Sequence, residues 1–193
     1  MSTVHKGLHH KRFKDLAERE EGFTLIELLV VLLIIGILLA IAIPTFLSTT
    51  HTASKTSAQA NLQTALTGAD AYYTSANQTY AGIDQPSTTV SDISDIDTNL
   101  SYVSGTNSTG LNSVSLWTDG STSLVLAAYS TGTRDCWYII DLKAATTIWG
   151  ASLGVGTYYA VDSGVDATAC VASGTAPGTG TVTGPQTGGF PSA

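Results

Sequence analysis

Three groups of side chains in this sequence could do chemistry. The first is a lone carboxylate, Glu27, near the start of an apolar run over residues 23–47. A carboxylate in apolar surroundings calls for a cation, since burying it alone is strongly unfavourable. The second group is a pair of cysteines, Cys136 and Cys170. The third is the acidic stretch SDISDIDTN at residues 91–99.

The cysteines favour a single disulfide if the region after the apolar run lies outside the cytoplasm. That bond would close a loop of about 35 residues and stabilise the fold by roughly 3–4 kcal/mol. Two buried free thiols are the alternative. A metal site at the cysteines has little support, because no CxxC pair occurs and the only histidine after Gly22 is His51.

The acidic stretch imitates the opening of a calcium-binding loop, with Asp95, Asp97 and Asn99 at alternate positions. An EF-hand also needs a glycine and a bidentate glutamate, and Leu100 and Thr106 stand at those positions. A solvated acidic loop is therefore the simpler interpretation. The weak calcium candidate consists of Asp92, Asp95, Asp97 and Asn99.

Catalysis finds no support in the sequence, which predicts neither an enzyme nor a cofactor. A Ser/His/Asp arrangement would need a base, and His51 stands directly after the apolar run.

Charge also excludes broad nucleic-acid binding. Residues 1–22 hold five basic and four acidic side chains, net +1, so a total of −7 leaves −8 on the rest. A surface of that sign repels phosphate backbones.

The apolar run is long enough to cross a membrane. About 20 apolar residues span a bilayer core, and residues 28–47 supply that number, with Glu27 at one interface. Because the basic residues precede the span, residues 1–22 are predicted to be cytoplasmic and the larger domain external.

The helix is predicted to continue to Ala76 as an amphipathic second half. Its first half is apolar all round, and its second half carries a narrow apolar stripe that another element must cover. The stripe consists of Leu62, Ala65, Leu66, Ala69, Tyr73 and Ala76.

Short runs of β-forming residues predict that an antiparallel sheet covers the stripe, which gives an α+β fold. Strands are expected at 123–129, 136–141 and 156–161, with a weaker candidate at 113–117. Residues 81–110 read as a long connection. The expected organisation is a leader at 1–22, a helix at 23–76, a sheet domain at 77–172 and a mobile Gly/Thr/Pro-rich tail at 173–193.

Gly22-Phe-Thr-Leu-Ile-Glu27, followed by the apolar run, resembles the class III leader junction of type IV pilins and pseudopilins. The resemblance covers residues 21–76 and is type IVa-like. The Cys136-Trp-Tyr and Gly156-Thr-Tyr-Tyr elements are similar to major pilins of Gram-positive, actinobacterial type.

The resemblance implies processing and polymerisation. A membrane-embedded prepilin peptidase would cut between Gly22 and Phe23 and N-methylate Phe23; glycine suits a narrow active site. The helices would then assemble into a helical fibre, in which Glu27 faces the new α-amine of a neighbouring subunit. Gly36 and Pro44 mark a segment that kinks or melts in the fibre.

Two functions follow from this resemblance. The chain is expected to be a structural subunit of a type IV pilus for adhesion, twitching motility or DNA uptake, held in the cytoplasmic membrane before the pilus machinery assembles it. The alternative is a pseudopilin of a type II secretion or competence machine. A membrane-anchored enzyme or receptor is disfavoured by the lack of catalytic groups.

Overall fold

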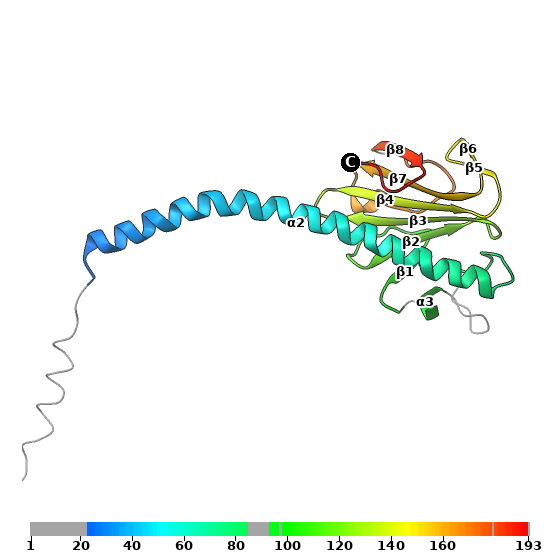
Figure 1. Cartoon of the computed structure of the whole chain (residues 1–193), viewed down its shortest axis with the longest axis horizontal. Coiled ribbons are helices and arrows are strands. Elements are labelled where there is room, and N and C mark those ends of the chain that lie inside the picture. Colours follow the sequence, from blue (N-terminus) through cyan, green and yellow to red (C-terminus); the bar gives the residue numbers. More distant parts are fainter. Residues whose placement is uncertain (1–22, 85–92, 97, 179, 193) are drawn as a thin grey trace, which may run out of the picture. The chain divides into compact units, whose positions relative to one another are not determined.

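Helix α2, Leu25–Ser75, is the first element in the computed structural model of the protein (Figure 1). It confirms the predicted long helix, although it begins at Leu25 rather than Phe23 and ends at Ser75 rather than Ala76. The described residues form two units, one ending at Phe46 and the other beginning at Leu47. The structure describes residues 23–84, 93–96, 98–178 and 180–192.

Six strands of the second unit form one sheet, in the order β1-β2-β3-β4-β7-β8. β1 is parallel to β2, and every other neighbouring pair is antiparallel. A hairpin, β5-β6, is a separate two-stranded sheet. The elements are α3 (Ile93–Ile96), β1 (Ser101–Ser104), β2 (Ser113–Thr118), β3 (Ser123–Ser130), β4 (Asp135–Leu142), β5 (Thr146–Ile148), β6 (Ala151–Leu153), β7 (Gly156–Ser163), the 3-10 turn η1 (Ala167–Ala169) and β8 (Thr181–Gln186).

The four predicted strand runs are confirmed as β2, β3, β4 and β7, which are consecutive neighbours in the sheet. β3 and β4 pair along their whole length, from Ser123 opposite Leu142 to Ser130 opposite Asp135. Every residue of these two central strands is buried, because both faces of the sheet are covered.

One face of the sheet packs against the part of α2 that belongs to the second unit. The buried stripe of this helix contains Ala58, Leu62, Ala65, Ala69 and Tyr72, at alternating intervals of four and three. That spacing keeps the apolar side chains on one helical face, and burying them stabilises the contact by about 25 cal/mol per Å².

The stripe differs from the prediction at one turn of the helix. Tyr72 rather than Tyr73 is fully buried, and its hydroxyl donates to the Ala81 carbonyl at 2.6 Å. Tyr73 is half-buried and packs its ring against Tyr80, with ring centroids 4.8 Å apart. The sequence pattern placed Tyr73 in the buried stripe, whereas the structure buries Tyr72 fully and leaves Tyr73 half-buried against the core.

The other face of the sheet is covered by the β5-β6 hairpin and by the chain that follows β7, which the Cys136–Cys170 disulfide holds in place. Cys136 lies on β4 and Cys170 directly after η1, and both are fully buried. The disulfide chosen from the sequence is therefore present, and the alternative of two free thiols is wrong.

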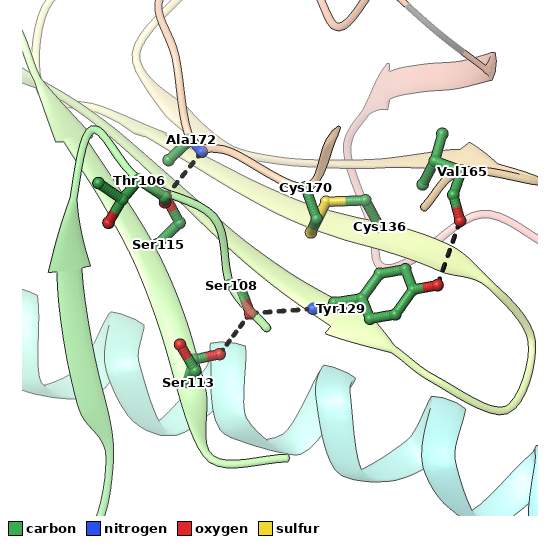
Figure 2. The surroundings of a disulfide bond; sticks show 9 residues. All are labelled: Thr106, Ser108, Ser113, Ser115, Tyr129, Cys136, Val165, Cys170 and Ala172. Carbon is green, nitrogen blue, oxygen red and sulfur yellow. Dashed lines mark hydrogen bonds between the residues drawn. A yellow bond between two sulfur atoms is a disulfide. The ribbon is translucent and has the colours of Figure 1, made fainter. Parts of the chain in front are cut away.

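Two serine hydroxyls join a loop before β2 to the same face (Figure 2). Ser108 Oγ donates to the Ser113 carbonyl at 2.6 Å and accepts from the Tyr129 backbone at 3.2 Å. Ser115 Oγ likewise accepts from the Ala172 backbone at 2.9 Å. Small hydroxyls here satisfy backbone groups that would otherwise be buried without partners.

The described parts of the tail and of the long connection contain elements that the sequence did not predict. Within the tail expected to be mobile, β8 pairs with β7 in antiparallel register, and Phe190 packs on Trp137 and Tyr159. The connection at 81–110 contains α3 and β1. Gly184 and Pro185 interrupt the β-forming residues of β8 and hide its strand pattern, whereas backbone pairing with β7 and the Phe190 ring hold the strand in place.

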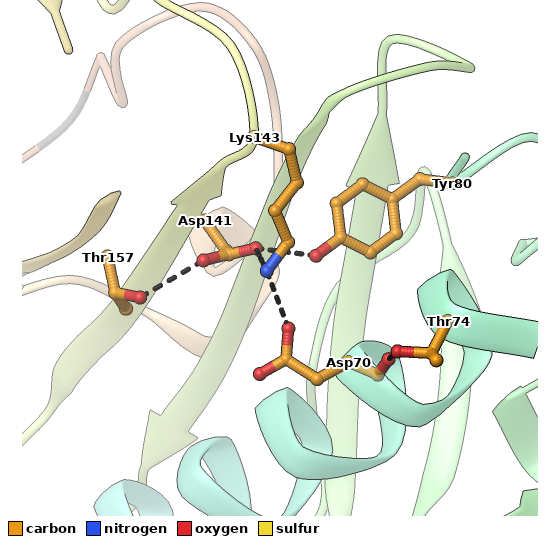
Figure 3. A network of polar contacts seen from close by, with 6 residues as sticks. All are labelled: Asp70, Thr74, Tyr80, Asp141, Lys143 and Thr157. Atoms are coloured by element: carbon orange, nitrogen blue, oxygen red, sulfur yellow. Dashed lines mark hydrogen bonds and ion pairs between the residues drawn. The ribbon is translucent and has the colours of Figure 1, made fainter. Parts of the chain in front are cut away.

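A polar network closes the end of the helix onto the sheet (Figure 3). Lys143 Nζ lies 2.7 Å from Asp70 of α2 and 2.9 Å from Asp141 of β4. Asp141 also accepts hydrogen bonds from the hydroxyls of Tyr80 and, at 3.0 Å, Thr157. The almost fully buried carboxylate thus has a cation and two hydroxyl donors, as a buried charge requires.

The network raises the pKa values of two of its side chains, Tyr80 and Lys143. Burial raises the pKa of Tyr80 far above its usual range, and the adjacent Asp141 carboxylate raises it further. Burial lowers the pKa of Lys143, but hydrogen bonds to Asp70 and Asp141 outweigh it and leave that pKa raised.

Folding stability is expected to fall as the pH rises above about 10, where tyrosine and lysine of the unfolded chain lose their protons. Tyr80 and Lys143 keep theirs in the folded protein, so their contribution is complete below the unfolded pKa and is lost above it. Each group contributes a slope of about 1.4 kcal/mol per pH unit. Denaturant titrations of the detergent-solubilised protein at increasing pH measure this slope.

Tyr80→Phe removes one of the two groups and should make the alkaline decline shallower. Tyr158→Phe is the matched control, because that hydroxyl bonds only the Gly154 carbonyl near the surface, at 3.2 Å. A Tyr80→Phe protein with an unchanged alkaline slope would contradict this assignment.

Candidate functional site

The candidate site is the start of α2, where the described chain opens with Phe23 and Thr24 before the helix begins at Leu25. Gly22 and the predicted leader lie outside the described residues. Phe23 and Thr24 are exposed and precede the first helical turn. A backbone of this kind, ahead of a helix, is open to a processing enzyme.

Thr24 is the N-cap of α2, and Glu27 is the third residue of the helix. The Glu27 backbone N–H donates to the Thr24 hydroxyl at 3.3 Å and to its carbonyl at 3.1 Å. The Thr24 hydroxyl lies 3.5 Å from the Glu27 carboxylate. Thr-x-x-Glu is the pattern of a capping box, and a carboxylate in the first turn is favoured by the helix dipole.

The cap explains why threonine and glutamate stand three residues apart in this segment. The role of Thr24 was not predicted, although the Thr-x-x-Glu pattern before an apolar run is a recognisable signal. Glu27 therefore stabilises the helix start through contacts within one chain.

The rest of the segment is an apolar surface that nothing in the described chain covers. All residues from 23 to 53 are exposed, and α2 is long and apolar enough to cross a membrane by length and composition. Monomeric soluble proteins rarely expose so large an apolar area. The exposed apolar side chains include Leu28, Val31, Leu32, Ile35, Leu38, Leu39 and Phe46.

Gly36 and Pro44 both lie within the helix. Pro44 has no N–H to donate to the Ala40 carbonyl, so one helical hydrogen bond is missing there. The Thr45 hydroxyl donates at 3.0 Å to the carbonyls of both Ile41 and Ala42. These carbonyls follow directly after the Ala40 carbonyl, which lacks its usual helical donor. Residues 36–44 are helical in the single subunit, and their kinking or melting in a fibre stays a prediction.

Only two residues of the weak calcium candidate, Asp95 and Asn99, lie within the described residues. Asp95 belongs to the short helix α3 and Asn99 follows it, whereas Asp92 and Asp97 lie outside the described residues. Within the described ranges no three His, Cys, Asp or Glu side chains are grouped to hold a metal ion.

Comparison with known proteins identifies one local similarity. Residues 19–43 match the prokaryotic N-terminal methylation motif, a stretch that contains Gly22, Phe23 and Glu27. No curated protein and no solved structure matches the chain. The similarity thus covers the junction and the apolar helix start, and the sheet domain has to be interpreted from its own geometry.

Thr24→Ala is expected to fray the first turn of α2, because the cap is lost at a cost of about 1 kcal/mol. The Glu27 amide, which donates to the Thr24 hydroxyl, should exchange its hydrogen about fivefold faster. Hydrogen exchange of the detergent-solubilised protein measures this. Thr24→Ser keeps a hydroxyl and should exchange like the wild type; equal rates in all three proteins would show that the cap contributes nothing.

Proposed function

We propose that this type IV pilin-like prepilin, defined by its methylation motif and its helix-on-sheet fold, is a structural subunit of a type IV pilus. One observation carries the proposal: an exposed apolar helix with a single carboxylate begins inside an N-terminal methylation motif. Such a surface has to be covered, first by lipid and then by the helices of other subunits.

The first step is proteolysis by prepilin peptidase. Hydrolysis of the Gly22–Phe23 peptide bond removes residues 1–22 and leaves a free α-amine on Phe23, which the same enzyme methylates. The methylation motif at residues 19–43 supports this step. The new cation stands four residues before Glu27, at the start of an otherwise apolar helix.

The second step is pairing between subunits. In a fibre of staggered helices, Glu27 of one subunit meets the α-amine of another. Two unit charges about 4 Å apart gain about 4 kcal/mol at an effective dielectric constant of about 20. A subunit inserted at the wrong height leaves both charges unpaired in an apolar interior, so the pair sets the register of assembly.

The other cations of the processed chain support this pairing, because each already has a partner. Only three lysines and arginines follow Gly22. Lys55 Nζ lies 4.7 Å from the centre of the Trp137 ring, Arg134 lies 2.6 Å from Asp166, and Lys143 is held by the polar network. The Phe23 amine is thus the one new cation that processing offers to Glu27.

The proposed fibre also gives a role to residues 28–47 and to Gly36 and Pro44 within them. The subunit is anchored in the cytoplasmic membrane by residues 28–47 until the pilus machinery moves it into the fibre. There Gly36 and Pro44 let the helix bend or open, since proline has already removed one hydrogen bond. A net charge of −8 after Gly22 disfavours broad nucleic-acid binding by the fibre surface.

Protein sheared from the cell surface tests the function directly. Its N-terminal sequence should begin with N-methylated phenylalanine, corresponding to Phe23, and electron microscopy should show long fibres that disappear when the gene is deleted. An unprocessed N-terminus on exported protein contradicts the proposal. Loss of protein secretion or DNA uptake without any loss of fibres would assign the chain to the pseudopilins instead.

Glu27→Ala and Glu27→Gln are expected to leave membrane insertion intact and to abolish fibres, because both remove the charge that pairs with the amine. Membrane fractionation measures insertion, and the sheared fraction measures assembly. Glu27→Asp keeps the charge on a shorter side chain and should retain part of the fibre yield. Normal fibres from Glu27→Gln would show that the charge is dispensable.

A further inference from the structure

We propose that a recess on the sheet domain binds a neutral sugar or a related polyol. The recess has a volume of ≈ 410 Å³, within the range of small-molecule sites. It lies where the end of β2, the β5 strand and the segment after Cys170 come together. This function goes beyond fibre assembly and does not depend on it.

An indole ring forms the apolar wall of the recess. Trp117, near the end of β2, is half-buried and lines the recess. The backbone at Gly174 packs directly on this ring, so a Cβ added there would lie 2.5 Å from the indole. The contact holds the ring in one place. A fixed aromatic surface with apolar faces suits the C–H face of a sugar ring.

A fixed carboxylate supplies the directional contact. Asp119 Oδ1 accepts hydrogen bonds from the backbone N–H groups of Ser121, Thr122 and Ser123, at 2.8, 3.0 and 3.0 Å. Burial opposes ionisation, but hydrogen bonds from Ser123 and from the backbone of the turn lower the pKa of Asp119. The group is therefore an ionised acceptor at neutral pH, and charged acceptors bind hydroxyl donors most strongly.

Hydroxyl groups complete the lining of the recess. Thr147 of β5 is exposed, and the hydroxyls of Ser173 and Thr175 lie 2.9 Å apart. These groups both donate and accept, as a ligand with several neutral hydroxyls requires. Aromatic wall, carboxylate and hydroxyls together match a sugar: its C–H face packs on Trp117 while its hydroxyls bond the polar side.

The charge of the recess excludes other ligand classes. None of the side chains that line it is cationic, and Asp119 repels phosphate or carboxylate groups. A calcium ion needs several charged oxygen ligands, and the lining holds one carboxylate. A long lipid chain would leave the Asp119 carboxylate and the hydroxyls of the lining without hydrogen-bond partners. A neutral polyol satisfies both the ring and the hydroxyls.

Saturation-transfer NMR and tryptophan fluorescence of the full chain, solubilised in a detergent without a sugar headgroup, test the proposal. The probes are glucose, galactose, mannose and N-acetylglucosamine, with glucose 6-phosphate as the anionic comparison. At least one neutral sugar should bind saturably in the millimolar range, and the phosphorylated sugar should bind more weakly. Absence of saturable binding by every neutral sugar overturns the proposal.

Matched variants locate the binding. Asp119→Asn should weaken sugar binding roughly tenfold or more, since a hydrogen bond to a charged group is lost. Asp166→Asn makes the same chemical change outside the recess and should bind like the wild type. If Asp119→Asn fails to fold by circular dichroism, Thr147→Val provides the test through its lost hydroxyl. Unchanged affinity in the folded recess variants, or saturable binding of N-acetyl amino acid amides in place of sugars, overturns the assignment.

Discussion

Apolar surface has to leave water, and α2 presents that requirement in two forms. In the part of the helix that belongs to the second unit, a narrow stripe from Ala58 to Tyr72 is covered by the sheet of the same chain. From Phe23 to Leu47 the apolar side chains point in every direction, and no element of the described chain covers them. The first problem is solved by folding, whereas the second requires lipid or other subunits.

The carboxylates Asp141 and Glu27 differ in the same way, because only Asp141 has a cation partner within the described chain. Asp141 is buried, but Lys143, Tyr80 and Thr157 satisfy it within one chain. Within the described residues, Glu27 has the cap contacts with Thr24, which stabilise a helix start without supplying a cation. A carboxylate with intramolecular partners belongs to the fold. One that lacks a cation at the edge of an apolar surface is suited to an interaction between molecules.

The features that the sequence predicted best depend on residues that are neighbours along the chain. The long helix, the four central strands and the Gly22–Glu27 junction are each encoded by neighbouring residues, so periodicity and composition reveal them. The prediction failed for β8, where Gly184 and Pro185 interrupt the β-forming residues and which is held by pairing with β7 and by Phe190. The choice between Tyr72 and Tyr73 also failed, because one helical position separates a buried side chain from a half-buried one.

By itself, therefore, the sequence determined the apolar helix, its single carboxylate and the methylation motif that includes them, because each depends on local order along the chain. Only the tertiary structure decided the rest. Lys143 meets Asp70 across 73 positions of the chain, and Trp117 meets Gly174 and Asp119 around one recess. No local pattern encodes such contacts, since they arise when strands and loops that are distant in sequence pack together.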